Sequence, residues 1–141
     1  MSYEEKNAWV FGVVTVVSYL AYCGIILTRA QGAPLADVSY AWTMVATIAA
    51  AILANIVLMI ILSVATRDRA QKDERDKEIG RRGDHIGQAF VVIGAVSALI
   101  MAMLELEYFW IANVIYLCFV LSAVTSSAAK LVAYRRGFQG W

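Results

Sequence analysis

Four long stretches of this 141-residue chain contain almost no charged residue. A hydrocarbon core about 30 Å thick is crossed by a helix of roughly 20 apolar residues, because each residue adds about 1.5 Å. In lipid every backbone amide must be hydrogen-bonded within its own segment, and none of the stretches shows the polar and apolar alternation of a barrel strand. The sequence therefore predicts an all-α integral membrane protein, a four-helix bundle in one transmembrane domain that covers residues 1–141. The predicted spans are residues 8–28, 38–64, 86–104 and 108–131.

The composition supports this class of protein. Hydrophobic residues make up 61% of the chain and charged residues only 16%, which is far from the balance of a soluble domain. We expect the first span to be retained rather than removed as a signal peptide. It follows the acidic pair Glu4 and Glu5 instead of a basic segment, and its apolar run is longer than that of a signal peptide. The lipid bilayer is thus an expected partner of the whole chain.

Lysine and arginine are distributed unequally between the connections. Of the 12 basic residues, only Arg29 lies between the first and second spans; the others precede the first span, lie in the linker at residues 66–85 or belong to the C-terminal segment. The positive-inside rule places these regions in the cytoplasm, so that both termini are inside. The short connection at residues 105–107 makes the third and fourth spans antiparallel neighbours.

The linker at residues 66–85 is predicted to be helical over most of its length. It has no helix breaker between residues 67 and 78, and we expect the second span to continue into it. Acids precede bases by four residues in the pairs Asp68 and Lys72, Asp73 and Lys77, and Glu78 and Arg82. Gly80 and Gly83 are predicted to bound a reversal of the chain, after which Asp84 caps the third span.

The linker also carries the residues expected to meet a cytoplasmic partner. Its seven bases and six acids leave a net charge of only +1, which argues against nucleic-acid binding and against strong binding of anionic lipid. One histidine among paired carboxylates favours a solvated side chain over a metal ligand, so that no metal or cofactor is predicted. The candidate interaction residues are Asp73, Glu74, Arg75, Asp76, Arg81, Arg82 and His85.

Residues 73–83 read Asp-Glu-Arg-Asp-Lys-Glu-Ile-Gly-Arg-Arg-Gly and lie between two hydrophobic spans. This order, an Asp-Glu-Arg stretch followed by an isoleucine and then basic residues, resembles the linker in a family of small predicted prokaryotic membrane proteins of unknown function. The resemblance is confined to the linker. It implies a bacterial or archaeal cytoplasmic membrane and no established activity.

Polar side chains within the spans are the other candidates for function, since each costs free energy in lipid unless it is hydrogen-bonded. No Asp, Glu, Lys, Arg or His lies at the centre of a span, which argues against a proton-coupled exporter. Asn55 and Asn113 lie at different depths, and each is predicted to make an interhelical hydrogen bond. The candidates for a polar pathway or for interhelical contacts are Thr15, Ser18, Tyr22, Asn55, Asn113 and Ser122.

Small residues repeat every four positions in three of the spans. The repeats are Ala46, Ala50 and Ala54 in the second, Gly94, Ala98 and Ala102 in the third, and Ser122 and Ser126 in the fourth. Such stripes let helix backbones approach closely, and we favour contact within one bundle over contact with a partner or a second copy. Cys23 and Cys118 lie at different depths, which predicts two packed thiols rather than a disulfide.

Known catalytic motifs are missing from the sequence. It contains no nucleophile elbow, zinc-protease helix, phosphate loop or dinucleotide fingerprint, and a single histidine excludes haem ligation by a histidine pair. We therefore expect no enzyme and no catalytic residue. The favoured function is a non-catalytic accessory or structural subunit that packs against itself or a larger membrane assembly. The alternative is a small dimeric transporter or channel with a polar intramembrane pathway.

Overall fold

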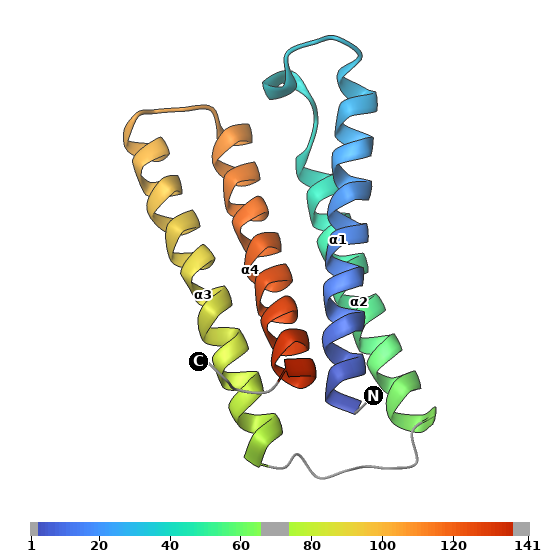
Figure 1. Ribbon diagram of the computed structural model, residues 1–141. Helices are drawn as coiled ribbons and strands as arrows, with labels where there is room; N and C mark the ends of the chain where they lie inside the picture. The colour runs from blue at the N-terminus through green and yellow to red at the C-terminus, as the bar shows by residue number, and fades with distance from the viewer. Residues whose placement is uncertain (1–2, 66–73, 137–141) are drawn as a thin grey trace.

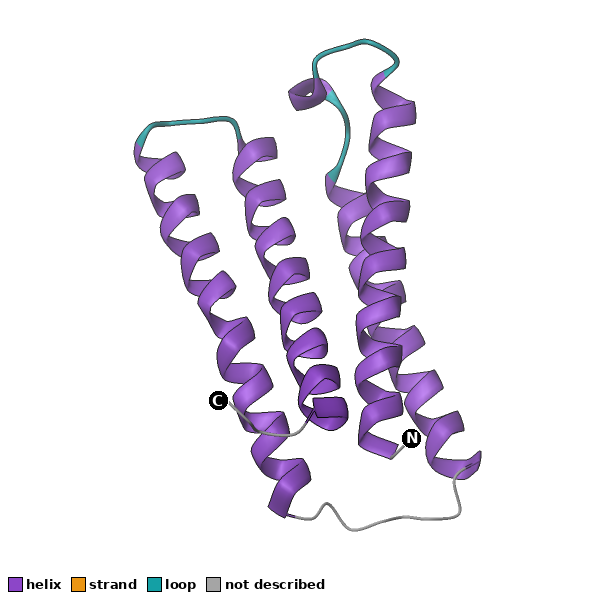
Figure 2. Cartoon of the chain, in the orientation of Figure 1, coloured by secondary structure: helices purple, strands orange, loops and turns teal. Residues whose placement is uncertain are grey.

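The computed structural model describes residues 3–65 and 74–136, and this part of the chain is helical with short connections (Figures 1 and 2). It contains α1 (Tyr3–Ala30), α2 (Ala41–Ala65), α3 (Glu74–Met103), α4 (Tyr108–Arg136) and a short 3-10 helix, η1 (Leu35–Asp37). Each of the four long helices is long and apolar enough to cross a membrane. The prediction of an all-helical fold with four helices able to cross a membrane is thereby confirmed.

The four helices are arranged in the order α3, α4, α1, α2 (Figure 1). The extensive helix contacts join α3 to α4, α4 to α1, and α1 to α2. Among the described residues no extensive contact joins α2 to α3, so the bundle is open on that side. The first residues of α1 and α3 and the last residues of α2 and α4 lie at one end of the bundle, which we call the charged end.

The turn between α3 and α4 is tight, as the sequence predicts. Glu105 adopts a left-handed backbone conformation with φ of 55°, and the amide of Leu106 donates to the carbonyl oxygen of Met101 at 3.1 Å. A left-handed residue after the last helical turn is a common way to end a helix. The chain can therefore reverse within residues 104–107 and pack α4 along α3.

The reversal predicted at residues 80–83 is wrong. Helix α3 runs without interruption from Glu74 to Met103, so that Asp84 lies inside the helix and does not cap it. Gly83 and Gly87 face α4 at close range: a β-carbon on Gly83 would lie 2.6 Å from Cγ of Lys130, and one on Gly87 would lie 2.6 Å from the carbonyl oxygen of Ser122. These glycines thus permit helix contact. The expected continuation of the second span falls on residues 66–73, outside the described residues.

The small-residue stripes serve two different surfaces. Gly94 and Ala98 are buried in α3, and Gly94 lies against Cys118 of α4, which confirms contact within the bundle for Gly94. Ala102, the third residue of this stripe, is exposed. In α2, however, Ala46 and Ala50 are exposed, and the interpretation as internal packing is wrong for them. None of the most apolar 18-residue window of α2 is buried. Helix α2 consequently presents most of its surface to its surroundings.

Candidate functional site: two grooves beside α4

Three tyrosines form the aromatic core of the half of the bundle remote from the charged end. The ring of Tyr116 from α4 makes edge contacts with Tyr19 and Tyr22 of α1, at centroid distances of 5.3 and 5.0 Å. The Tyr22 side chain is 1% exposed, and its hydroxyl donates to Oδ1 of Asn113 at 2.7 Å. The amide of Asn113 in turn donates to the carbonyl oxygen of Phe109 at 2.7 Å. The hydrogen bond between Tyr22 and Asn113 thus joins α1 to α4, and it is the interhelical hydrogen bond predicted for Asn113.

An apolar groove of about 430 Å³ lies between α1, α2 and α4, and we call it the α2 groove. Three of the candidate polar residues line it: Thr15 and Ser18 from α1, and Asn55 from α2. The hydroxyl of Thr15 is already used, because it donates to the carbonyl oxygen of Phe11 at 2.7 Å. The remaining lining is largely aliphatic and aromatic and includes Ile48 from α2 and Phe119 from α4.

Asn55 is the unusual residue of the α2 groove. It lies two positions from the middle of the 25-residue α2, and its Oδ1 is buried without a hydrogen-bond partner in the described part of the chain. A carboxamide oxygen buried without a partner costs about 1–3 kcal/mol. The other asparagine of the spans, Asn113, has both its oxygen and its amide bonded within the chain. The two asparagines therefore differ in whether the chain satisfies them.

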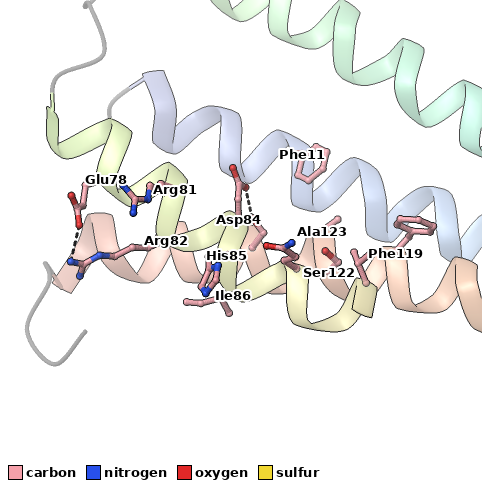
Figure 3. Close-up of a pocket in the computed structure, with 13 residues that line it drawn as sticks. Phe11, Glu78, Arg81, Arg82, Asp84, His85, Ile86, Phe119, Ser122 and Ala123 are labelled. Carbon is pink, nitrogen blue, oxygen red and sulfur yellow. Dashed lines mark hydrogen bonds and ion pairs between the residues drawn. The ribbon is translucent and has the colours of Figure 1, made fainter. Parts of the chain in front are cut away.

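A second and larger groove, of about 1150 Å³, lies at the charged end beside α3, and we call it the α3 groove (Figure 3). Phe11 of α1 and Phe119, Ser122 and Ala123 of α4 line it, together with residues of α3 from Glu78 to Val91. Ser122 therefore faces this groove, whereas Thr15, Ser18 and Asn55 face the other. The six residues of the expected polar pathway therefore do not line one groove: some line the α2 groove, Ser122 lines the α3 groove, and Tyr22 and Asn113 bond to each other.

Ion pairs and hydrogen bonds hold the charged first turns of α3 against α4. Asp84 lies 2.7 Å from Nζ of Lys130 and accepts a hydrogen bond from Ser126 at 3.0 Å. About two turns before Asp84 on α3, Asp76 accepts a hydrogen bond from the hydroxyl of Tyr134 of α4 at 2.8 Å. These contacts extend the helix pair beyond its apolar part. The sequence marks Asp84 and Lys130 only as charges at the ends of spans, since nothing local to either shows that they meet.

The predicted interaction residues that the structure describes lie in the first three turns of α3 and are spread over several of its faces. Arg82 pairs with Glu78 at 2.7 Å, which confirms one of the predicted pairs with four-residue spacing. Glu74 pairs with Lys77 at 3.1 Å. Arg75 and Arg81 are exposed, and neither has an ion pair within residues 3–65 and 74–136. Asp73 lies outside the described residues.

Metal ligands do not gather in this part of the chain. Across the two described segments, no three His, Cys, Asp or Glu side chains lie close enough together to hold a metal ion. The thiols of Cys23 and Cys118 are both free, and Cys118 packs opposite Gly94. Comparison of the chain with protein-family models, with curated proteins and with solved structures found no match. Proposals about function therefore rest on the grooves and on their polar residues.

Proposed function

We propose that this protein is a non-catalytic subunit of the cytoplasmic membrane of a prokaryote, which assembles with a second copy of itself through the α2 groove. The charged end, with both termini, lies in the cytoplasm in this proposal. The observation that carries the proposal is the buried, unpartnered Oδ1 of Asn55 in the wall of an apolar groove. The positive-inside distribution of lysine and arginine supports the orientation.

Lipid can solvate the apolar surface of α2, but it cannot supply a hydrogen bond to Oδ1 of Asn55. Acyl chains solvate Ile48 or Ile52 as well as another helix would, so that the exposed aliphatic face of α2 does not by itself require a protein partner. Acyl chains offer no hydrogen-bond donor to an amide oxygen. A partner that brings a polar side chain to the groove removes this cost, and a protein helix can do so at this depth.

A second copy of the chain supplies a suitable group. A carboxamide is both donor and acceptor, so that two copies of Asn55 can bond reciprocally once each side chain turns its buried Oδ1 toward the groove, each amide donating to the other oxygen. Reciprocal contact of one residue with itself is the geometry of a two-fold dimer interface, the commonest symmetry among homo-oligomers.

Replacing Asn55 with leucine is expected to weaken self-association and to leave the fold intact. Interhelical hydrogen bonds in membranes contribute about 0.6 kcal/mol on average and up to about 1.7, which corresponds to an approximately 3- to 20-fold weaker association. The measurement is energy transfer between donor-labelled and acceptor-labelled copies reconstituted in lipid vesicles, as a function of protein-to-lipid ratio.

The matched control is Asn113→Leu. This change removes an amide that is bonded within the chain, so we expect it to lower the thermal stability and to leave energy transfer unchanged in the folded fraction. Equal energy transfer in wild type and Asn55→Leu would contradict the proposed interface. Ion or solute flux through vesicles that is lost in Asn55→Leu would instead support a transport pathway.

A further inference from the structure

We propose that the α3 groove is a binding site for one anionic phospholipid, whose phosphate is held by Arg81 and whose acyl chain lies against Phe11, Val91 and Phe119. The groove is charged at one end and apolar at the other. Its charged lining residues are Glu78, Arg81, Arg82, Asp84 and His85 (Figure 3). Phe11, Val91 and Phe119 are its apolar lining, and Gln88, Ser122 and Ser126 line it as well. A surface with this division matches an amphiphile better than a soluble anion.

The pairing of charges leaves Arg81 as the cation that can bind a phosphate. Both carboxylates of the groove are engaged: Asp84 by Lys130 at 2.7 Å and by Ser126, and Glu78 by Arg82 at 2.7 Å. Arg81 has no ion pair in the described part of the chain and is exposed. The linker as a whole is nearly neutral, yet the fold thus exposes an unpaired guanidinium beside an apolar groove. A guanidinium binds phosphate oxygens through two parallel hydrogen bonds.

Helical spacing places Arg81 on the same side of α3 as the apolar wall. Residues 81, 84, 88 and 91 recur at intervals of three and four, so that Arg81, Asp84, Gln88 and Val91 share one face. Figure 3 shows Arg81 and Asp84 on the side of α3 toward Phe11 of α1. Arg82 and His85 also line the groove, and Arg82 is paired with Glu78. The guanidinium and the apolar lining therefore belong to one continuous surface.

The depth of these residues fits one leaflet of a bilayer. Asp84 and Lys130 are the first charged residues met along α3 and α4 from the apolar part toward the charged end, and they mark the hydrocarbon boundary. Arg81 lies about 4.5 Å outside Asp84, where lipid phosphates lie. Val91 lies about 10.5 Å further along α3 than Asp84, inside the hydrocarbon layer of one leaflet, which is about 15 Å thick.

The test compares Arg81→Gln with Arg75→Gln in the full chain. Arg75 is also exposed and unpaired in the described segments and lies on the same helix, but it does not line the groove. Each protein is reconstituted in bilayers of phosphatidylcholine with a minor fraction of phosphatidylglycerol and is then extracted gently. Native mass spectrometry counts the phosphatidylglycerol that each chain retains.

Wild type and Arg75→Gln are expected to retain one phosphatidylglycerol per chain, and Arg81→Gln about fivefold less, as expected for the loss of one interfacial charge. Equal retention by Arg81→Gln and wild type would overturn the proposal, and so would equal losses in the two variants, which would indicate general surface attraction. Displacement of the lipid by inorganic phosphate alone would show a soluble-anion site and would also overturn it. A loss of energy transfer between copies in Arg81→Gln would place a second chain in this groove, against the proposal. Unchanged lipid retention in Asn55→Leu would show that lipid binding in the α3 groove does not depend on self-association through the α2 groove.

Discussion

Replacing Gly87 with alanine is expected to force α3 away from α4 and to lower the free energy of unfolding by about 1–3 kcal/mol, the usual cost of an overpacked contact. The added methyl group would lie 2.6 Å from the carbonyl oxygen of Ser122 and 3.0 Å from Cβ of Ser126. Backbone atoms cannot rotate away as the end of a flexible side chain can, so the helices themselves must shift. The measurement is thermal unfolding of the purified protein in detergent, followed by circular dichroism at fixed protein concentration.

Gly80→Ala is the matched control on the same helix. A β-carbon at Gly80 would meet nothing within 4 Å, and alanine is favoured over glycine inside a helix by about 0.5–1 kcal/mol. We therefore expect Gly80→Ala to raise the stability slightly while Gly87→Ala lowers it. If both changes were stabilising, the close contact between α3 and α4 would be refuted. If Gly80→Ala were strongly destabilising, residues 80–83 would not be helical.

Replacing Asp84 with alanine is expected to lower the stability by about 1–2 kcal/mol. Asp84 is the acceptor for both Lys130 and Ser126, and hydrogen bonds to charged groups contribute about 1.5–3 kcal/mol when sheltered from water. The Asp84 side chain is 70% exposed, which reduces this value, whereas Lys130 is only 25% exposed and would keep a poorly solvated ammonium. The same detergent unfolding measurement reports the loss.

Two further variants separate the ion pair from other effects of the change. In the Asp84→Ala background, Lys130→Met removes the orphaned charge but keeps the aliphatic stem that packs against Gly83, and part of the lost stability should return. Glu78→Ala breaks a solvent-exposed pair with Arg82 and should cost no more than about 0.5 kcal/mol. A cost for Asp84→Ala as small as that for Glu78→Ala would show that Asp84 does not hold α3 to α4.

The apolar spans could be predicted from the sequence because their signal is local. Burial in lipid depends on the length and composition of a single segment, and α1, α2 and α4 each contain or closely match a predicted span. The antiparallel pairing of α3 with α4 could also be predicted, because the connection at residues 105–107 is too short for any other arrangement.

The error at residues 80–83 arose because glycine has two uses. A glycine can end a helix or can let a neighbouring helix approach, and the sequence around Gly83 does not distinguish them. The interval of four between Gly83 and Gly87 is a signal of close helix packing, but it has meaning only if the helix already extends through both. The position of Ser126 and Lys130 of α4, which are distant from Gly83 in the sequence, decides between the two uses.

Pairings between distant residues could not be predicted at the candidate sites. Tyr22 and Asn113 are 91 positions apart, and each was identified as a polar residue of a span without its partner. The same is true of Asp84 and Lys130, whose pairing leaves Arg81 without an ion pair among residues 3–65 and 74–136. Whether an asparagine is satisfied, as Asn113 is, or unsatisfied, as Asn55 is, depends on the packing of whole helices.

The insertion of four helices in the membrane with the charged end inside is tested most directly by labelling single cysteines with a thiol reagent that does not cross membranes. In a background with Cys23→Ala and Cys118→Ala, Arg75→Cys and Glu105→Cys place one thiol at each end of α3, both at exposed positions. In intact bacterial cells we expect Glu105→Cys to be labelled, and Arg75→Cys to be labelled only after the membrane is permeabilised. Labelling of Arg75→Cys in intact cells, or equal labelling of both positions before permeabilisation, would contradict the account.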